Sequence, residues 1–490
     1  MPPYRNSSSL SLAEPSLRTP LKEWVDRSLS DALSMARRES SPVLHVSGRR
    51  VEWELPLRAF DSSIEDANLM VGRDGAVMGV GAAMLMEPGA SRLVGSGPTR
   101  GLLGEGIVST EDASKILVMG GWGFPPRRGL KESGIWRDFP PSRWVVPAFT
   151  LVSGGEGVHL ALAVYVRPSS DSAPLRARYR ALVKALGPRA PSGSHGQGAG
   201  EAILPKLVSA RSVPSQKRWV SLAQDAIDSI SRDEMKKVVL SRAVSLTFKG
   251  DVPASAVLRR LIALNPDSTV FAVKRRGTVF LGASPEGLMS VKNGDVEVDC
   301  LAASTPRSND RAKDETLGAR LLEDSKSRRE HQFVVRAAVS ALSPLSSKIE
   351  VPDTPVLKKL TTIQHLYTPV KATLLDEEDV WAAAHALWPN PAIGGEPKEK
   401  AVSWIRQFEK LSRGWYSGVV GVLNASLDEA NLVVGIRSGV IRGRQAVIYA
   451  GAGLVAGSEP REEFEETTWK LRTMGRALGI DKDLSGIREE

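Results

Sequence analysis

The sequence has a single cysteine, Cys300, among 490 residues. One cysteine excludes an internal disulfide framework and is typical of a reducing compartment, so we expect a cytoplasmic protein. No apolar run approaches the ~20 residues that a membrane-spanning helix needs, so no membrane association is expected. The N-terminal stretch MPPYRNSSSLSLAEPSLRTP lacks the apolar core of a secretory signal, and residues 1–20 are expected to be disordered.

A surface dominated by one sign of charge is also missing. The formal net charge is +9 and the pI is about 9.5, but the 65 basic residues are scattered among 56 acidic ones. No aromatic–basic repeat predicts a base-stacking groove, so no nucleic-acid partner is expected. A small anionic substrate is compatible with the positive balance. The apolar content of 42% and charged content of 25% are those of an ordinary globular protein.

The pattern of apolar residues changes along the chain. Residues 43–166 show short apolar runs broken by Gly, Pro and Asp, which predict many strands. The second half interleaves strands and helices without a strict βαβ repeat, which indicates an α/β or α+β architecture. We therefore divide the chain into a disordered 1–20, an N-terminal half 21–186, a linker or mobile loop 187–215, a catalytic region 216–478 and a tail 479–490.

Individual elements follow from the same patterns. Helices are expected at 176–186, 217–232, 314–342 and 380–387. Strands are expected at 237–242, 270–274, 279–281, 296–301, 417–423, 431–437 and 446–449.

The C-terminal segment YAGAGLVAGS, residues 449–458, combines an apolar run with repeated glycine. It predicts a strand leading into a loop where another group approaches the backbone. Ser458 stands where a helix N-cap is expected, with Pro460 in the first turn. On the helix that follows, Glu463, Glu466 and Lys470 share one face. The two carboxylates have two interpretations. They are suitable ligands for Mg²⁺, or they form an acidic first turn that complements the helix dipole.

Two further polar residues lie at the ends of apolar strands. Lys237 opens the run KVVLSR and is interpreted either as a lysine that extends to solvent or as a partly desolvated base. Glu286, in the turn SPEGL at 284–288, is either a solvated turn acid or an acid held near a leaving group.

Three more candidates have similar alternatives. Glu330 begins an apolar helical run and is either a solvated charge or a cation ligand. His365 is either a structural histidine or part of a site. Arg437 ends the run VVGIR and is suited to binding a carboxylate through two hydrogen bonds.

Taken in order, these segments resemble the chorismate-utilising enzyme family, which includes isochorismate, salicylate, anthranilate and aminodeoxychorismate synthases. The similarity is continuous over about 215–475, and a weaker similarity reaches forward to GGWGF at 120–124 and WRDFPPSRWVVP at 136–147. The matching motifs are KVVLSR at 237–242, SPEGL at 284–288, LAASTPR at 301–307, RREH at 328–331, IQHLYTPV at 363–370, NPAIGGEPK at 390–398, GIRSG at 435–439 and YAGAGLVAGS at 449–458 with EEFEETTWK. The resemblance implies the chorismate-utilising enzyme fold, an α+β arrangement with a large, mostly antiparallel β-sandwich core and helices packed outside.

The residue at position 237 indicates which branch of the family the chain resembles. Ammonia-using anthranilate synthases carry glutamine there, whereas the water-using isochorismate and salicylate synthases carry lysine, as here. Ala302 stands where aminodeoxychorismate synthases have a nucleophilic lysine. The sequence has no glutamine amidotransferase domain, and no such subunit is expected as a partner. NPAIGG is closer to the P-T-P-A of isochorismate synthases than to salicylate synthases.

The resemblance also implies roles. Lys237 would activate the water that attacks ring carbon 2 of chorismate, and Glu286 would protonate the hydroxyl leaving carbon 4. Mg²⁺ would be held by Glu330, Glu463 and Glu466. The substrate would contact the residues Ser304, His365, Arg437, Tyr449, Gly451, Gly453 and Lys470.

Two positions depart from the family pattern. Trp388 replaces a histidine or glutamine, and Ala303 replaces a glycine, so both are expected to alter the pocket wall. The sequence predicts an isochorismate synthase for menaquinone or siderophore synthesis, as a monomer or homodimer. The alternatives are a salicylate synthase, which also eliminates pyruvate, and a non-catalytic binding protein.

Overall fold

The computed structural model describes residues 20–73, 75–86, 107–125, 134–154, 157–187, 203–359, 363–375 and 380–481. Most of the N-terminal segment expected to be disordered, the first part of the expected linker and most of the tail lie outside these ranges. Within the described ranges, no helix combines the length and apolar content needed to cross a bilayer.

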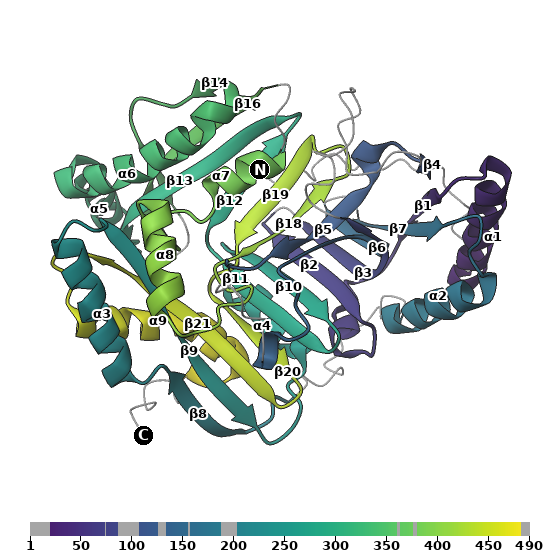
Figure 1. Cartoon of the computed structure of the whole chain (residues 1–490), viewed down its shortest axis with the longest axis horizontal. Helices are drawn as coiled ribbons and strands as arrows, with labels where there is room; N and C mark the ends of the chain where they lie inside the picture. Colours follow the sequence, from purple (N-terminus) through teal and green to yellow (C-terminus); the bar gives the residue numbers. More distant parts are fainter. Residues whose placement is uncertain are drawn as a thin grey trace.

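The helices lie mainly at the two ends of the molecule, with the strands between them (Figure 1). Most have one buried apolar face, as in α1, where Trp24, Val25, Leu29, Ala32 and Ala36 are buried. The α-helices are α1 (Leu21–Glu39), α2 (Ser172–Leu186), α3 (Gln216–Ser231), α4 (Ala254–Leu264), α5 (Arg311–Glu323), α6 (Ser325–Leu342), α7 (Val380–Leu387), α8 (Lys398–Phe408) and α9 (Pro460–Leu478).

The strands predicted in both halves of the chain are present. Those of the N-terminal half are β1 (Val43–Val51), β2 (Asp66–Gly72), β3 (Gly75–Met86), β4 (Val108–Ser109), β5 (Leu117–Trp122), β6 (Ser142–Gly154) and β7 (Gly157–Val166). Those of the C-terminal half are β8 (Leu207–Val213), β9 (Lys237–Phe248), β10 (Thr269–Arg275), β11 (Thr278–Ser284), β12 (Gly287–Lys292), β13 (Asp295–Pro306), β14 (Ser346–Glu350), β15 (Val356–Lys359), β16 (Ile363–Leu374), β17 (Gly395–Glu396), β18 (Val419–Asn424), β19 (Glu429–Val434), β20 (Ser438–Arg442) and β21 (Gln445–Val455).

Most of the strands lie in two arms that diverge from β6, and β7 with β1 forms a third branch from the same strand. The first arm runs β6–β3–β2–β10–β11–β20–β21–β9–β8. The second arm runs β6–β5–β18–β19–β12–β13–β16. Among the described pairings only β1 with β4 is parallel, so the mostly antiparallel α+β fold is confirmed.

The two arms place the candidate site. The chain crosses from the first arm to the second in the turn between β11 and β12, which contains Glu286. It crosses back between β19 and β20, where Arg437 lies. The backbone N–H of Val434 donates to the carbonyl of Glu286 at 3.1 Å, so the two crossings lie side by side.

Several local predictions need correction. The helix expected at 314–342 is two helices, because the Asp324 side chain caps a new helix at Ser325. The N-cap of α9 is Glu459 rather than Ser458. Part of the expected linker 187–215 is a strand, β8, which pairs with β9. The strand expected to end at Arg437 ends at Val434.

Candidate active site

Lys237 is the first residue of β9, and its side chain crosses the neighbouring strand β21. A Cβ added at Gly453 would lie 2.9 Å from Lys237 Cε and 3.4 Å from Nζ. The two residues share one face, because Gly453 pairs with Val239, two residues along β9 from Lys237. Gly453 therefore leaves the space that the lysine side chain occupies.

Gly451 and Gly453 also turn their backbone groups towards the edge of β21 that faces away from β9. The N–H groups of Val239 and Ser241 donate away from β21, to Gly394 O at 2.9 Å and Glu409 Oε2 at 2.8 Å. Val239 and Ser241 therefore form non-hydrogen-bonded pairs with Gly453 and Gly451 of β21. The N–H and C=O groups of the two glycines point away from β9, to the opposite edge of β21. Lys470 Nζ donates to Gly451 O at 2.9 Å on that edge. The described pairing of β20 with β21 ends at Ile448.

Glu286 is fixed by the serine that precedes it in the SPEGL turn. Ser284 Oγ donates to Val434 O at 2.7 Å and accepts from the Glu286 N–H at 3.2 Å. Burial raises the pKa of the Glu286 carboxyl. A hydrogen bond from Asn390 and the charges of three cations oppose this rise, and the cations are Lys237, Arg437 and Lys470. The carboxyl thus lies within electrostatic reach of three other candidate residues.

Arg437 has φ +50°, the left-handed region, in the crossing between β19 and β20. Its carbonyl accepts from the Ala283 N–H at 3.2 Å, which ties this crossing to the end of β11. Burial lowers the pKa of the guanidinium, opposed by Tyr416, Glu466 and Glu286. Arg437 is therefore a partly desolvated cation between the acid and the helix α9.

Tyr449 is placed differently from the other candidates. It is buried, and its hydroxyl accepts a hydrogen bond from Trp136 Nε1 at 2.8 Å. Its ring stacks on Tyr416, with centroids 5.0 Å apart. Tyr416 lies within electrostatic reach of Arg437, and a Cβ at Gly451 would lie 3.1 Å from its hydroxyl. Sequence reasoning missed Tyr416, although the segment WYSG at 415–418 precedes a predicted strand.

The carboxylates of α9 face one another as the helical spacing predicted. Ser458 Oγ donates to Glu463 Oε1 at 2.8 Å, and Lys470 Nζ lies 2.5 Å from Glu466 Oε1. Burial raises the pKa of Glu463, and the nearby Glu466 raises it further. Two adjacent carboxylates and a hydroxyl are an oxygen donor set that fits a hard divalent cation, which would relieve their repulsion.

The third expected cation ligand, Glu330, lies on α6, and its side chain is outside the described part of the structure. Among the described side chains, no group of three or more His, Cys, Asp or Glu is close enough to complete a metal site. The described donors are therefore those of α9.

His365 and Ser304 are cross-strand partners in β16 and β13. Burial lowers the pKa of His365, although the Ala303 backbone hydrogen-bonds to the ring. Ala303 sits in a bulge at φ +55°, a conformation that favours glycine and costs other residues about 1–2 kcal/mol. Ala303 thus replaces the glycine of the family pattern at a position where the backbone conformation itself favours glycine. The Ser304 side chain lies outside the described part.

Asn390 was not singled out from the sequence, yet it contacts the candidate acid directly. Its Nδ2 donates to Glu286 Oε1 at 2.6 Å. Two residues earlier, Trp388 is buried and donates from Nε1 to Ser417 O at 2.9 Å. It also packs edge-on against Trp122 and Phe124, so this departure adds an aromatic side chain beside the site.

A buried ion pair supports this loop and β9 together. Arg413 and Glu409 are 3% and 2% exposed and form two hydrogen bonds of 2.6 and 2.7 Å. Arg413 also donates to Ile393 O at 3.0 Å and to Val239 O at 2.8 Å. The pair therefore joins the strand of Lys237 to the loop of Asn390.

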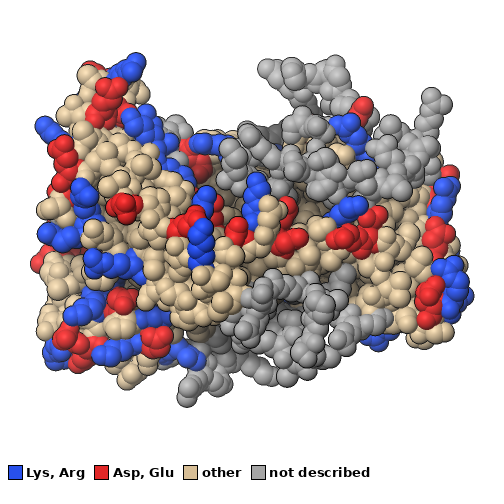
Figure 2. All heavy atoms as spheres, turned by 90° about the horizontal axis from the view of Figure 1, so that it is seen from above, with Lys and Arg blue, Asp and Glu red and all other residues tan. Residues whose placement is uncertain are grey.

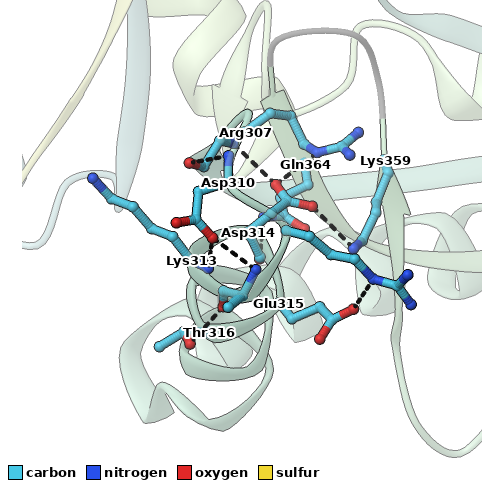
Figure 3. Close-up of polar contacts among 11 residues, drawn as sticks. Arg307, Asp310, Lys313, Asp314, Glu315, Thr316, Lys359 and Gln364 are labelled. Atoms are coloured by element: carbon cyan, nitrogen blue, oxygen red, sulfur yellow. Dashed lines mark hydrogen bonds and ion pairs between the residues drawn. The ribbon is translucent and has the colours of Figure 1, made fainter.

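A second polar network supports the antiparallel strand pair β13–β16, which carries Ser304 and His365, and its polar contacts are drawn in Figure 3. Asp314, at the start of α5, accepts from Arg307 Nε at 2.8 Å and from Lys359 Nζ at 3.2 Å. Its carbonyl accepts from Gln364 Nε2 at 3.3 Å. The arginine and the Ser308 N–H lower the pKa of the Asp314 carboxyl well below its usual range.

Neither the described charges on the face in Figure 2 nor a remote cavity indicates a second site. On the face in Figure 2, the described acidic and basic side chains are intermixed rather than gathered into one basic stripe. A cavity of about 920 Å³ lies between β8, α4 and the end of α9, and none of the candidate residues lines it. The site described above rests on the side-chain contacts themselves.

Comparison with known proteins defines the class. A family model described as chorismate binding enzyme matches residues 74–479. The chain therefore belongs to the chorismate binding enzyme family.

Individual relatives are more specific. The salicylate biosynthesis isochorismate synthase of Pseudomonas aeruginosa is 34% identical over 74% of this chain and 75% of its own length. Isochorismate synthase MenF of Bacillus subtilis is 35% identical over 75% of each chain. The structure of MenF, the menaquinone-specific isochorismate synthase from Escherichia coli, superposes with a TM-score of 0.73. It is 23% identical and covers 92% of this chain and 99% of its own, which shows the shared fold.

Proposed function

We propose that the protein is an isochorismate synthase that converts chorismate to isochorismate. Its curated relatives from Pseudomonas and Bacillus carry that name. The observation that supports the chemistry is the proximity of a buried carboxyl, Glu286, to the amine of Lys237. Burial favours the protonated form of the carboxyl, and the lysine lies within its electrostatic reach. An acid and a base so arranged suit a reaction that adds water at one carbon and expels a hydroxyl from another.

In the proposed reaction, the Lys237 amine takes a proton from a water molecule as its oxygen bonds to ring carbon 2. The ring double bonds shift, and the carbon 4–oxygen bond breaks. Glu286 gives its proton to the departing hydroxyl, which leaves as water. One water enters and one leaves, so the substrate and product are isomers.

Orientation of the substrate is assigned to the opposite edge of β21. Arg437 and the amide N–H groups of Gly451 and Gly453 would bind the enolpyruvyl carboxylate. The arginine is cationic, and the two N–H groups point to that edge of β21. Lys470 would help to balance the carboxylates of α9. Ser304 and His365, on the paired strands β13 and β16, would line the ring.

Mg²⁺ is the proposed cofactor. Glu463 and Glu466, with Glu330 from α6, would hold it directly or through water. When bound, the ion neutralises the ring carboxylate and anchors the substrate. The chain's own residues then activate the water and protonate the leaving group.

The test is a product assay with chorismate and Mg²⁺ in H₂¹⁸O, followed by chromatography and mass spectrometry. Isochorismate with one ¹⁸O in the carbon 2 hydroxyl is the expected result. Release of pyruvate with fluorescent salicylate, without a second enzyme, would show a salicylate synthase instead. Absence of turnover would contradict the enzymatic proposal altogether.

The product would supply menaquinone or siderophore synthesis, in the cytoplasm and without a glutamine amidotransferase subunit. Because water is the proposed nucleophile, addition of ammonium should not produce anthranilate. Ammonium-dependent anthranilate in the same assay would contradict this part.

A further inference from the structure

Asn390 holds one oxygen of the candidate acid in a defined way. Its Nδ2 donates to Glu286 Oε1 at 2.6 Å, and its Oδ1 accepts from the Ala392 N–H at 3.0 Å. The second hydrogen bond fixes the orientation of the amide, because only the carbonyl oxygen can accept from a backbone N–H. The group that faces Glu286 is therefore a donor.

The turn that carries Asn390 is fixed from several sides. The Ile393 and Gly394 N–H groups donate to Asn390 O at 3.2 and 2.9 Å. Gly394 O accepts from Val239 N, and Ile393 O accepts from Arg413 Nη1. Asn390 is thus held on a rigid support that also contacts the strand beginning at Lys237.

A donor at Oε1 has a chemical consequence. Oε1 accepts in this bond, and the carbonyl oxygen of a protonated carboxyl is a stronger acceptor than its hydroxyl oxygen, so the bond favours the form of Glu286 that carries its acidic proton on Oε2. The same N–H favours the carboxylate that remains after the proton has left. The asparagine therefore directs the proton and stabilises the product form of the acid.

We propose that Asn390 is a positioning residue, which assigns the transferable proton of Glu286 to Oε2 and stabilises the carboxylate formed by proton transfer. This role rests on the proposed isomerase function, and it adds a residue that does not itself contact the reacting carbons.

The experiment compares wild type with Asn390→Asp and Asn390→Leu. The aspartate retains the acceptor for Ala392 N and the side-chain shape but removes the donor to Glu286, whereas the leucine removes both bonds. We expect kcat to fall roughly 10- to 100-fold in both, since ~1 Å of misplacement can cost ~10²-fold. KM for chorismate should change less than kcat.

The pH profile supplies a readout that a structural role would not move. The donor from Asn390 lowers the pKa of Glu286, so its removal should raise that pKa. The limb of the kcat/KM profile that reports the ionisation of Glu286 should therefore move to higher pH. The shift should be larger for Asn390→Asp, because the new carboxylate has the same charge as that of Glu286. The cations facing the acid, Lys237, Arg437 and Lys470, are unchanged in both variants.

The matched control is Lys398→Met. Lys398 Nζ donates to Trp388 O at 2.6 Å and Ala386 O at 3.2 Å, so it secures the same loop away from Glu286. We expect this control to have a lower melting temperature than wild type. Both limbs of its kcat/KM pH profile should stay at the wild-type pH values. The positioning role is refuted if Asn390→Asp has wild-type kcat and limbs, or if Lys398→Met reproduces its shift. Wild-type protein that fails to convert chorismate refutes the proposed function instead.

Discussion

Gly453 lies directly beneath the Lys237 side chain, so that a methyl group on the glycine would come 2.9 Å from Lys237 Cε. Cβ atoms do not tolerate so close a contact, and the flexible end of the lysine would be the part to move. The glycine on β21 thus determines where the amine on β9 can lie.

The first prediction is that Gly453→Ala lowers kcat by roughly 10-fold or more while the protein remains folded, because the amine is displaced from the attacking water. Gly250→Ala is the control, since its added Cβ would have an ordinary 3.8 Å contact with Pro205. Steady-state kinetics and melting curves of both variants make the measurement. Equal kcat for wild type and Gly453→Ala would show that the lysine position is not critical.

The second prediction concerns the base itself. Lys237→Ala should lower kcat by about 10²–10⁴-fold, the usual contribution of a general base. Lys236→Ala is the neighbouring control, because its ammonium group is largely exposed and pairs with Asp233. Turnover of chorismate by Lys237→Ala at the wild-type rate would refute the assigned base.

The third prediction concerns the α9 carboxylates. Glu466→Gln should weaken Mg²⁺ binding by roughly 10-fold or more, because it removes a charged oxygen ligand of a hard cation. Titration calorimetry with MgCl₂ measures this without reference to turnover. Glu465→Gln, one residue away and also exposed, should bind Mg²⁺ like wild type. Equal affinities for the two variants would place the metal elsewhere.

The fourth prediction concerns stability and pH. Asp314 has a folded-state pKa below its unfolded value, so its ionised form stabilises the fold above about pH 4, the unfolded value. Asp314→Asn should therefore melt at a lower temperature than wild type at pH 7. The difference should narrow as the pH falls below about 4, because the carboxyl of the unfolded chain then becomes protonated while the folded one is still ionised, which favours the unfolded state of the wild type.

Glu315→Gln is the control for this prediction, since the Glu315 side chain is 60% exposed and forms its ion pair with the exposed Arg311. Its melting temperature should equal that of wild type at both pH values. A pH-independent loss in Asp314→Asn would contradict the electrostatic origin of the effect.

Sequence reasoning was most successful where a residue's neighbours lie close along the chain. The spacing of Glu463, Glu466 and Lys470 placed them on one helical face, and the structure has the Glu466–Lys470 pair on α9. Glycine in an apolar strand predicted a close approach, and Gly453 has one with Lys237. These features depend on helix and strand periodicity alone.

The remaining features depend on contacts that periodicity does not encode. Asn390 meets Glu286 across 104 residues of sequence, and Trp136 meets Tyr449 across 313. The hydrogen bond from Trp136 and the stacking on Tyr416 place Tyr449 in an aromatic cluster built from a strand, a 3-10 helix and a turn that are far apart along the chain. The roles assigned to the site residues stay predictions until the variants above are measured.

The Glu409–Arg413 pair has a consequence for redesigning this enzyme. One support carries both the strand of Lys237, the proposed base, and the loop behind Glu286, the proposed acid, so neither can be adjusted without disturbing the other. The paired strands β13 and β16, which carry Ser304 and His365 and are proposed to line the ring, have their own support at Asp314. Changes of substrate preference should therefore be sought on these two strands, where new side chains can be introduced while the positions of Lys237 and Glu286 are kept.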